Sequence, residues 1–291
     1  MSGLKQSQPE IIVGDNGSID GTWETLQSTG LSLPVPLRTF QISTPGKSRI
    51  LNEAVRIAKG DLLFFLDDDV IVDRGWLDAV ATYFNQSPRL AAQGTIRIPP
   101  EELTDPEVAR LVQRYRTVHQ FEYDRNADDV QTLNGANMAI RREVFAKVGN
   151  FDTRLGPGAL GTSEDVELAQ RIRLAGIKIG YMADAVVYHE LNRERLTEAY
   201  FKTLHQKQGR SRLIYKDQSA GRIIFDYFRV TAQFAFYALS SNERKTYRSK
   251  GRMYHYRAML QTKLGIKNSP ELPTRDRACP DTLDPKLTKQ E

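Results

Sequence analysis

The chain has 291 residues, 40% of them hydrophobic and 26% charged, so it can bury a sizeable core as one large domain or two small ones. A single cysteine, Cys279, excludes an intrachain disulfide and a cysteine-rich zinc site and indicates a reducing compartment. No apolar run reaches about 18 residues, which argues against a spanning helix, and the start of the chain lacks the apolar segment expected of a signal peptide. The formal net charge of +5 suits a phosphorylated ligand, nucleic acid or an anionic membrane, and it does not choose among them.

Short apolar runs alternate with helical periodicity in the first half of the chain. Residues 10–13 and 62–66 predict strands, and residues 46–58 predict a helix between them. The run 62–66 is apolar without alternation, which is typical of a strand covered on both faces. We therefore expect an α/β fold with an open, mostly parallel (mixed) sheet flanked by helices.

The rest of the chain continues this pattern and then changes character. Further strands are predicted at 90–98, 134–140 and 185–188, and helices at 105–123, 142–148 and 164–175. Beyond residue 195 the chain predicts long basic helices, including an amphipathic one at 223–239 with a polar stripe of Asp226, Arg229 and Gln233. We expect a domain over 1–194, a helical extension over 195–267 and a disordered tail over 268–291, which is rich in prolines and charges.

Three carboxylates, Asp67, Asp68 and Asp69, follow the predicted strand 62–66 directly. Like charges at the end of a buried strand repel one another unless a cation neutralises them. Oxygen ligands favour Mg²⁺ or Mn²⁺, which usually complete their shell with phosphate and water. A solvated turn is the simpler interpretation of such a triplet, and its place after a buried strand favours the metal site.

Three other groups of residues are candidates for binding or catalysis. Residues 15–22 offer a carboxylate and an amide to a base or ribose, although a turn capped by Asp20 explains them too. Glu164 and Asp165 open a helix, where the helix dipole keeps a carboxylate ionised as a general base requires, but acids are common in first turns. His189 follows a strand, and a lone histidine is more often structural than a ligand.

The order and spacing of these groups resemble family 2 glycosyltransferases of the GT-A fold over residues 8–189. The segments that carry the resemblance are 11–22, 46–61, 65–69, 134–142, 148–152 and 161–168, with Phe65-Leu66-Asp67-Asp68-Asp69 similar to the family's Asp-x-Asp motif. The resemblance implies an inverting, metal-dependent transfer of a sugar from a UDP, GDP or dTDP donor to a saccharide, lipid-linked or other hydroxyl acceptor.

The resemblance also implies roles for individual residues. Asp165 is the expected catalytic base, with Glu164 second, and Asp69 and His189 are the expected metal ligands. Nucleotide-sugar binding is expected of seven residues: Asp15, Asn16, Ser18, Lys47, Asn52, Asp67 and Asp68. A nearby cation such as Lys47 would stabilise charge on the leaving diphosphate.

The family's first strand and most of its first helix have no counterpart here, and residues 2–7 resemble the end of that helix. Since that strand lies inside the family's sheet, its neighbours would lack backbone partners. We expect this 291-residue chain to be impaired in donor binding and stability unless another segment completes the sheet.

Two other functions fit parts of the pattern. A nucleotidyltransferase acting on a sugar phosphate shares the metal and nucleotide but needs a Gly-rich phosphate loop that is not visible. A non-enzymatic basic module would bind membrane or nucleic acid, but no nucleic-acid motif is present and no nucleic-acid partner is expected. We expect a cytoplasmic protein, and residues 223–239 could pack on the N-terminal domain or hold the chain peripherally at the inner face of the membrane.

Overall fold

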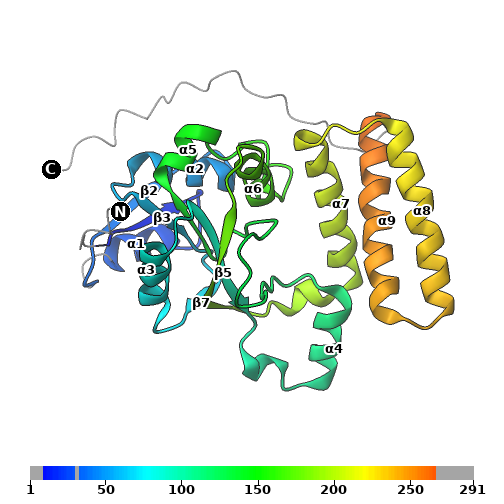
Figure 1. The fold of residues 1–291 in the computed structure, drawn as a ribbon, viewed down its shortest axis with the longest axis horizontal. Coiled ribbons are helices and arrows are strands. Elements are labelled where there is room, and N and C mark those ends of the chain that lie inside the picture. The colour runs from blue at the N-terminus through cyan, green and yellow to red at the C-terminus, as the bar shows by residue number, and fades with distance from the viewer. Residues whose placement is uncertain (1–8, 30–32, 267–291) are drawn as a thin grey trace.

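The computed structural model describes residues 9–29 and 33–266, and their strands and helices alternate through the first two thirds of the chain (Figure 1). The first elements are β1 (Ile11–Asp15), α1 (Thr22–Thr29), β2 (Leu37–Gln41), α2 (Lys47–Ile57), β3 (Leu62–Phe65), β4 (Val70–Val72), α3 (Trp76–Gln86) and β5 (Ala91–Arg97). They are followed by the 3-10 helix η1 (Pro100–Leu103), α4 (Pro106–Tyr115), β6 (Met138–Arg141), α5 (Arg142–Val148), α6 (Glu164–Leu174) and β7 (Ile179–His189).

The sheet is mixed and divided into two parts. Five strands are joined in the order β3-β6-β5-β7-β4, and β1 pairs separately with β2. Among the described residues, β1–β2 and β5–β7 are parallel, whereas β3–β6, β5–β6 and β4–β7 are antiparallel. Antiparallel pairing is therefore more extensive than the predicted mostly parallel sheet, because strand direction depends on which strands become neighbours and the apolar runs do not specify that.

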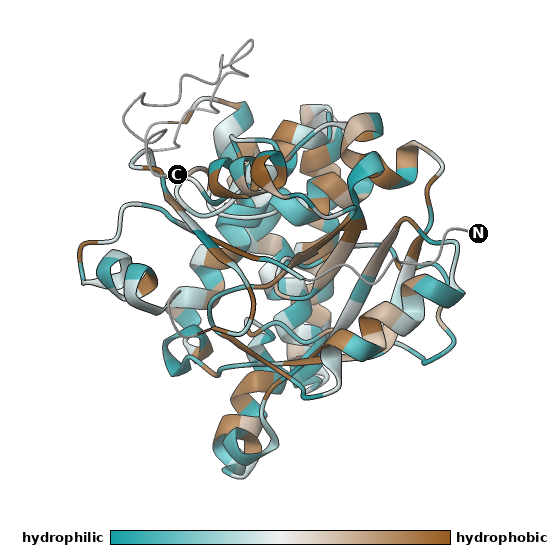
Figure 2. Ribbon diagram, turned by 90° about the vertical axis from the view of Figure 1, so that its left-hand side faces the viewer, coloured by the Kyte–Doolittle hydropathy of each residue, from teal (hydrophilic) through white to brown (hydrophobic). Residues whose placement is uncertain are grey.

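Helices cover both faces of the five-stranded sheet. One core cluster joins β3 and β6 to α2, α5 and α6 through side chains such as Val55, Phe145 and Leu168. The other packs α3 on the opposite face through Trp76 and Val80. Figure 2 shows hydrophobic residues concentrated along the strands in the middle of the molecule. The apolar run is thus covered on both faces at Leu62, Leu63 and Phe65, whereas Phe64 and Leu66 are exposed, so full burial of the predicted strand is only partly confirmed.

Three predicted elements differ in extent from the observed ones, and one of them is the strand expected over 185–188, which is β7 and begins already at Ile179. The helix expected over 105–123 ends at Tyr115, and Arg116 takes a left-handed conformation with φ of 53°. The strand expected over 134–140 begins only at Met138. The preceding backbone is held by side chains instead: Asn134 Oδ1 accepts from the Ala136 amide, and Asn137 Nδ2 donates to the Thr95 and Ala185 carbonyls.

The last part of the described chain is helical. It consists of η2 (Arg193–Leu196), α7 (Glu198–Tyr215), α8 (Ala220–Leu239) and α9 (Glu243–Lys263), with α9 between α7 and α8 (Figure 1). The prediction that residues 223–239 pack their apolar face on the N-terminal domain is wrong, because α8 packs chiefly on α9 and leaves several phenylalanines exposed. No described helix is long and apolar enough to cross a membrane. The predictions for 2–7 and 268–291 lie outside the described residues.

Candidate active site

The carboxylates after β3 meet positively charged side chains from distant parts of the chain. Asp67 Oδ1 forms an ion pair with Lys47 Nζ, from the first turn of α2. Asp69 Oδ2 lies 3.1 Å from Nη2 of Arg195 in η2. Asp68, between them, is exposed. The repulsion expected within the triplet is therefore relieved by two cations of the chain itself.

Lys47 links this loop to the start of α6. Its Nζ lies 3.7 Å from Oε1 of the buried Glu164. Burial alone would lower the pKa of Lys47, but the charges of Asp67 and Glu164 outweigh burial and raise it. The Lys47 amide donates to the Pro157 carbonyl at 2.9 Å, so the Gly-rich loop before α6 is attached to the start of α2.

The loop that precedes α6 has residues with positive φ and packs closely against the start of α2. Gly158 has a φ of +83°, and a Cβ there would lie 2.5 Å from the Gly46 amide nitrogen. Ser163, the residue before the helix, has a φ of 77°, which is uncommon for a residue with a side chain. This strained turn places Glu164 and Asp165 beside Lys47.

The two acids at the start of α6 have different environments. Glu164 is buried, and burial followed by the nearby Asp165 charge raises its pKa to about 7, against the lowering effect of Lys47. Asp165 is partly exposed, and its Oδ2 accepts from the Gly135 amide at 3.1 Å. The loop before β6 therefore meets α6 at this carboxylate. We call Asp67, Asp69, Glu164 and Asp165 the carboxylate cluster.

His189 ends β7 next to Asp69, with its Nε2 3.4 Å from Asp69 Oδ1. Its Nδ1 is 2.9 Å from the Glu190 carbonyl oxygen, so Nδ1 carries the proton and Nε2 presents its lone pair. The carboxylate oxygen suits Mg²⁺ or Mn²⁺, and the neutral imidazole nitrogen beside it is a ligand that transition-metal ions accept. The described residues contain no group of three or more His, Cys, Asp or Glu side chains that could hold a metal ion.

The loop after β1 lies next to the start of α2. The buried Asp15 accepts from the Ser18 amide at 3.1 Å and from Gln41 Nε2 at 2.7 Å. Hydrogen bonding by the Ser18 side chain, and then by Gln41 and the Ser18 amide, lowers the pKa of Asp15 despite burial. Asn16 donates to the Ile42 and Thr44 carbonyls and accepts from the Gly46 amide. Asn16 thus fixes the backbone that leads into Lys47, while the Ser18 side chain remains exposed.

Comparison with known families decides between the alternatives that the sequence left open. The sequence model of the family described as "Glycosyltransferase like family 2" matches residues 3–211, well over half of the chain. The chain belongs to this family. Membership in glycosyltransferase family 2 favours sugar transfer over both the nucleotidyltransferase and the non-enzymatic binding module.

Individual members of the family are distant relatives. Glycosyltransferase AglE of Haloferax volcanii is 23% identical over 184 residues, which make up 63% of this chain and 57% of that protein. The glucosyl-dolichyl phosphate glucuronosyltransferase of the same organism is 24% identical over 151 residues, 50% of this chain and 48% of that protein. The chain thus spans about half the length of these two relatives.

Solved structures share the fold at low sequence identity. Mannosyltransferase PcManGT from Pyrobaculum calidifontis, in complex with GDP-Man and Mn²⁺, matches with a TM-score of 0.56 and 18% identity over 89% of this chain and 78% of that one. GalNAc-T7 with UDP, GalNAc and Mn²⁺ matches with a TM-score of 0.50 and 16% identity over 91% and 52%. These likenesses confirm the predicted GT-A fold, in which helices flank a mixed sheet.

Within this family member, Asn52, like Asn16, is a predicted donor-binding residue with both ends of its side-chain amide occupied by structural contacts. Asn52 Nδ2 donates to the Phe151 carbonyl at 3.0 Å, and its Oδ1 accepts from the Phe151 amide at 2.9 Å. Both ends of the amide thereby join α2 to the loop after α5. The remaining predicted residues, Asp15, Asn16, Ser18, Lys47 and Asp67–Asp69, lie along the loops that lead to the carboxylate cluster.

Two residues at the site have no counterpart in the sequence predictions. Arg195 contacts both Asp69 and His189. His119 Nδ1 is 2.9 Å from Asn134 Nδ2, and its ring centroid is 5.8 Å from that of His189. Burial lowers the pKa of His119; the charge of Asp165 opposes this shift, and the charge of Arg195 adds to it. His119 therefore lies between the start of α6 and the end of β7. In the sequence, Arg195 is marked only by its place a few residues after a predicted strand, and this is a weak indication of a site residue.

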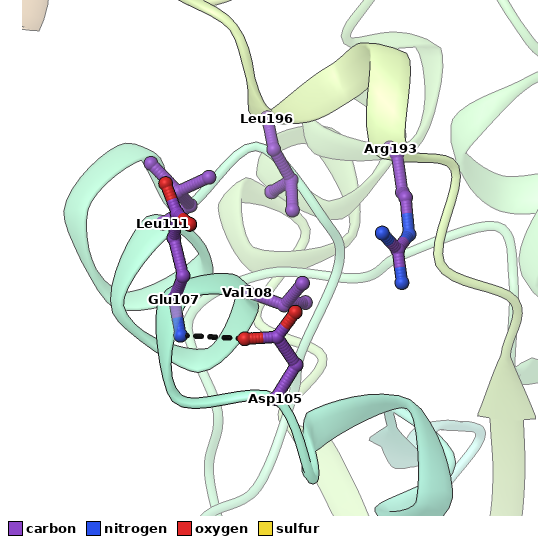
Figure 3. Close-up of a pocket in the computed structure, with 6 residues that line it drawn as sticks. All are labelled: Asp105, Glu107, Val108, Leu111, Arg193 and Leu196. Atoms are coloured by element: carbon purple, nitrogen blue, oxygen red, sulfur yellow. Dashed lines mark hydrogen bonds between the residues drawn. The ribbon is translucent and has the colours of Figure 1, made fainter.

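Figure 3 shows a hollow between α4 and η2. It is lined by Asp105, Glu107, Val108, Leu111, Arg193 and Leu196, from α4 and η2. The carboxylate of Asp105 accepts from the Glu107 amide at 2.9 Å and so caps α4. No member of the carboxylate cluster lines this hollow, and we assign it no part in catalysis.

Proposed function

We propose that this chain transfers a sugar from a nucleotide-sugar donor to an acceptor hydroxyl, with inversion at the anomeric carbon and with the help of a divalent metal ion. The observation that carries the proposal is the convergence of Lys47, Asp67 and Glu164 next to Asp165, with Asp69 and His189 on the adjoining loop. Family membership supplies the reaction class, and the arrangement of these side chains supports the assignment of roles.

The donor would lie across the ends of β1, β3 and β7. Asp15, held in its charged form by hydrogen bonds, is placed to accept from a base or ribose. Lys47 and Arg195 are the cations closest to the carboxylate cluster, and they would bind the diphosphate. Mn²⁺ accompanies the nucleotide in the complexes of PcManGT and GalNAc-T7, which supports the same class of donor here.

The proposed metal is Mn²⁺ or Mg²⁺, held by Asp69 and His189. When bound, such an ion supplies positive charge that stabilises the diphosphate leaving group. His189 suits this position because its Nδ1 proton is directed to the Glu190 carbonyl oxygen. In the part of the chain that the structure describes, these two candidate ligands lie close together, and the donor phosphates and water would complete the coordination.

Asp165 is our choice for the base, and its surroundings support it over Glu164. Asp165 is partly exposed and beside the Gly135 amide, so an acceptor can reach it. Glu164 is buried against Lys47. In the reaction the acceptor oxygen forms a bond to the anomeric carbon and its proton passes to Asp165. The bond from that carbon to the diphosphate oxygen breaks, and its electron pair leaves with the nucleotide.

The proposal is tested by comparing Asp69→Asn with Asp73→Asn, because Asp73 is an exposed aspartate four positions further along that is assigned no part in the site. Thermal shift with nucleotide sugars and Mn²⁺, followed by donor hydrolysis, measures binding and chemistry separately. We expect Asp69→Asn to abolish Mn²⁺-dependent binding and hydrolysis and Asp73→Asn to retain most of both. Equal behaviour of the two variants would contradict the assigned metal site.

A further inference from the structure

The outer face of α8 is apolar and exposed along its whole length. Ile224, Phe225, Phe228, Phe236 and Leu239 follow one another at helical spacing and share one side of the helix. Phe225, Phe228, Phe236 and Leu239 are 60%, 67%, 66% and 88% exposed, respectively. Scattered exposed apolar residues are ordinary in proteins, but a continuous stripe of this kind indicates a binding surface.

No described part of the chain covers this stripe. The buried side of α8 carries Ile223, Asp226 and Val230, and the helix packs chiefly against α9. Figure 1 shows α8 as the outermost element of the helical part, with α9 between it and α7. The stripe therefore faces away from the domain that carries the active site.

Positive charge accompanies the stripe. Residues 220–263, which form the α8–α9 hairpin, contain nine lysines and arginines but only two acids, Asp226 and Glu243. Asp226 is buried and paired with Arg222 at 3.1 Å and Arg229 at 2.7 Å, and both arginines border the stripe. Further exposed basic residues of α9 are Arg244, Lys245, Arg248, Arg257 and Lys263.

Charge decides between the two partners that an apolar stripe could meet. A second copy of this chain would bring another strongly basic hairpin against the first, and the like charges would repel. The surface of an anionic bilayer offers an apolar interior for the phenylalanines and phosphates for the arginines and lysines. We propose that the outer face of α8 binds the surface of an anionic lipid bilayer, with the helix lying in the plane of that surface.

Contacts of α7 connect this surface to the active site. Thr162 Oγ1 lies 3.4 Å from Ser211 Oγ, and a Cβ on Gly161 would lie 2.8 Å from the Lys207 side chain. Ser211 and Lys207 belong to α7, and residues 161–163 form the turn before Glu164. Because α9 packs on both α7 and α8, a bilayer on α8 lies at a fixed orientation to that turn. The membrane proposal itself does not depend on the reaction.

The test is flotation of the full chain with vesicles of phosphatidylcholine alone or mixed with phosphatidylglycerol. We expect flotation with the anionic vesicles only, weakened by added salt. The triple variant Phe225→Ser, Phe228→Ser, Phe236→Ser should lower partitioning at least about tenfold. Replacement of Arg244, Lys245 and Arg248 by Gln should lower it about tenfold as well. Leu174→Ser, on the exposed side of α6, is the matched control and should float as the wild type does.

The result is interpretable because the substituted side chains are exposed and should leave the fold intact, which circular dichroism checks. Absence of flotation with anionic vesicles overturns the proposal, and so does unchanged flotation of the triple serine variant. A wild-type dimer that the serine variant abolishes, measured by light scattering in the absence of vesicle binding, assigns the stripe to a second copy instead.

Discussion

The guanidinium of Arg195 lies across the two side chains that we assign to the metal. Its Nη2 is 3.1 Å from Asp69 Oδ2, and its Nη1 is 3.4 Å from His189 Nε2. Arg195 therefore neutralises Asp69 and occupies the lone-pair side of the imidazole. A divalent ion bound by Asp69 and His189 would compete with this arginine, which would then be free to contact the diphosphate.

We predict that Arg195→Met raises the affinity for Mn²⁺ measured without nucleotide, because the variant removes a positive charge that repels the ion. This repulsion is worth about 1 kcal/mol, so the dissociation constant for Mn²⁺ should fall about fivefold. The same variant should lower kcat by about tenfold or more, since a cation near the leaving group is lost. Calorimetric titration with Mn²⁺ and a transfer assay measure the two effects.

Arg193→Met is the control for that variant. Arg193 lies in the same 3-10 helix but faces the hollow of Figure 3 and contacts neither Asp69 nor His189 in the described structure. Unchanged Mn²⁺ affinity in Arg195→Met would show that the arginine does not occupy the metal position.

Asp165→Asn should leave donor binding nearly intact and reduce kcat by about a thousandfold, as expected when a general base is lost. The substitution preserves the shape of the side chain and keeps one of the two oxygens that accept from the Gly135 amide at 3.1 Å and from the Val166 amide at 2.7 Å, and circular dichroism checks that the fold persists. Stopped-time transfer assays give kcat, and titration with donor gives its dissociation constant.

Glu164→Gln discriminates between the two neighbouring acids. If Asp165 is the base, Glu164→Gln should reduce kcat much less than Asp165→Asn does and should mainly weaken donor binding, because Lys47 loses a partner. The reverse order of kcat losses would assign the base to Glu164, whose pKa of about 7 also suits proton transfer near neutral pH.

Lys47→Met should destabilise the fold by about 1–3 kcal/mol, because Asp67 and the buried Glu164 lose their shared cation. The double variant Lys47→Met, Glu164→Gln should recover much of that stability, since one of the two stranded charges is gone. It should not recover donor affinity if Lys47 binds the diphosphate. Denaturant unfolding and donor titration separate the two effects, and additive stability losses would contradict the coupling.

How much of the site the sequence reveals depends on how local each signal is. Asp67–Asp69 and Glu164–Asp165 each follow or begin an element with clear apolar periodicity, so both could be located in advance. Arg195 could not, because its contact with Asp69 joins residues 126 positions apart and depends on the path of the chain after β7. The motif predicts donor binding for Asn52, but its side-chain amide forms two hydrogen bonds with the Phe151 backbone.

The fold shows the same division. The buried strand β3 and helices α2 and α6 follow from periodicity alone. The start of β6 does not, because Asn134 and Asn137 side chains replace backbone pairing there. The face that α8 buries was also predicted wrongly, since periodicity shows that a helix has two faces but not which one a neighbour covers. Here the buried face includes Asp226, whose charge is compensated by two arginines.

Two half-buried histidines make the stability of the helical part depend on pH. His205 of α7 packs on Phe201, with ring centroids 4.5 Å apart, and a Cβ on Gly251 of α9 would lie 2.3 Å from its Nε2. Burial lowers the pKa of His205 to about 4 and that of His255, on α9, to about 3. Both histidines are therefore neutral where α7 and α9 cross.

A folded-state pKa below the unfolded value of about 6.5 means that the unfolded chain binds the proton first as the pH falls. Stability from these groups is then complete above about pH 6.5 and decreases down to about pH 4, by about 3 kcal/mol for His205. His205→Gln should flatten this part of the stability profile, measured by urea unfolding between pH 7 and pH 4. Phe201→Leu, which removes packing but no titrating group, should lower stability by a similar amount at every pH. A His205→Gln profile parallel to that of the wild type would show that this histidine is not buried in its neutral form.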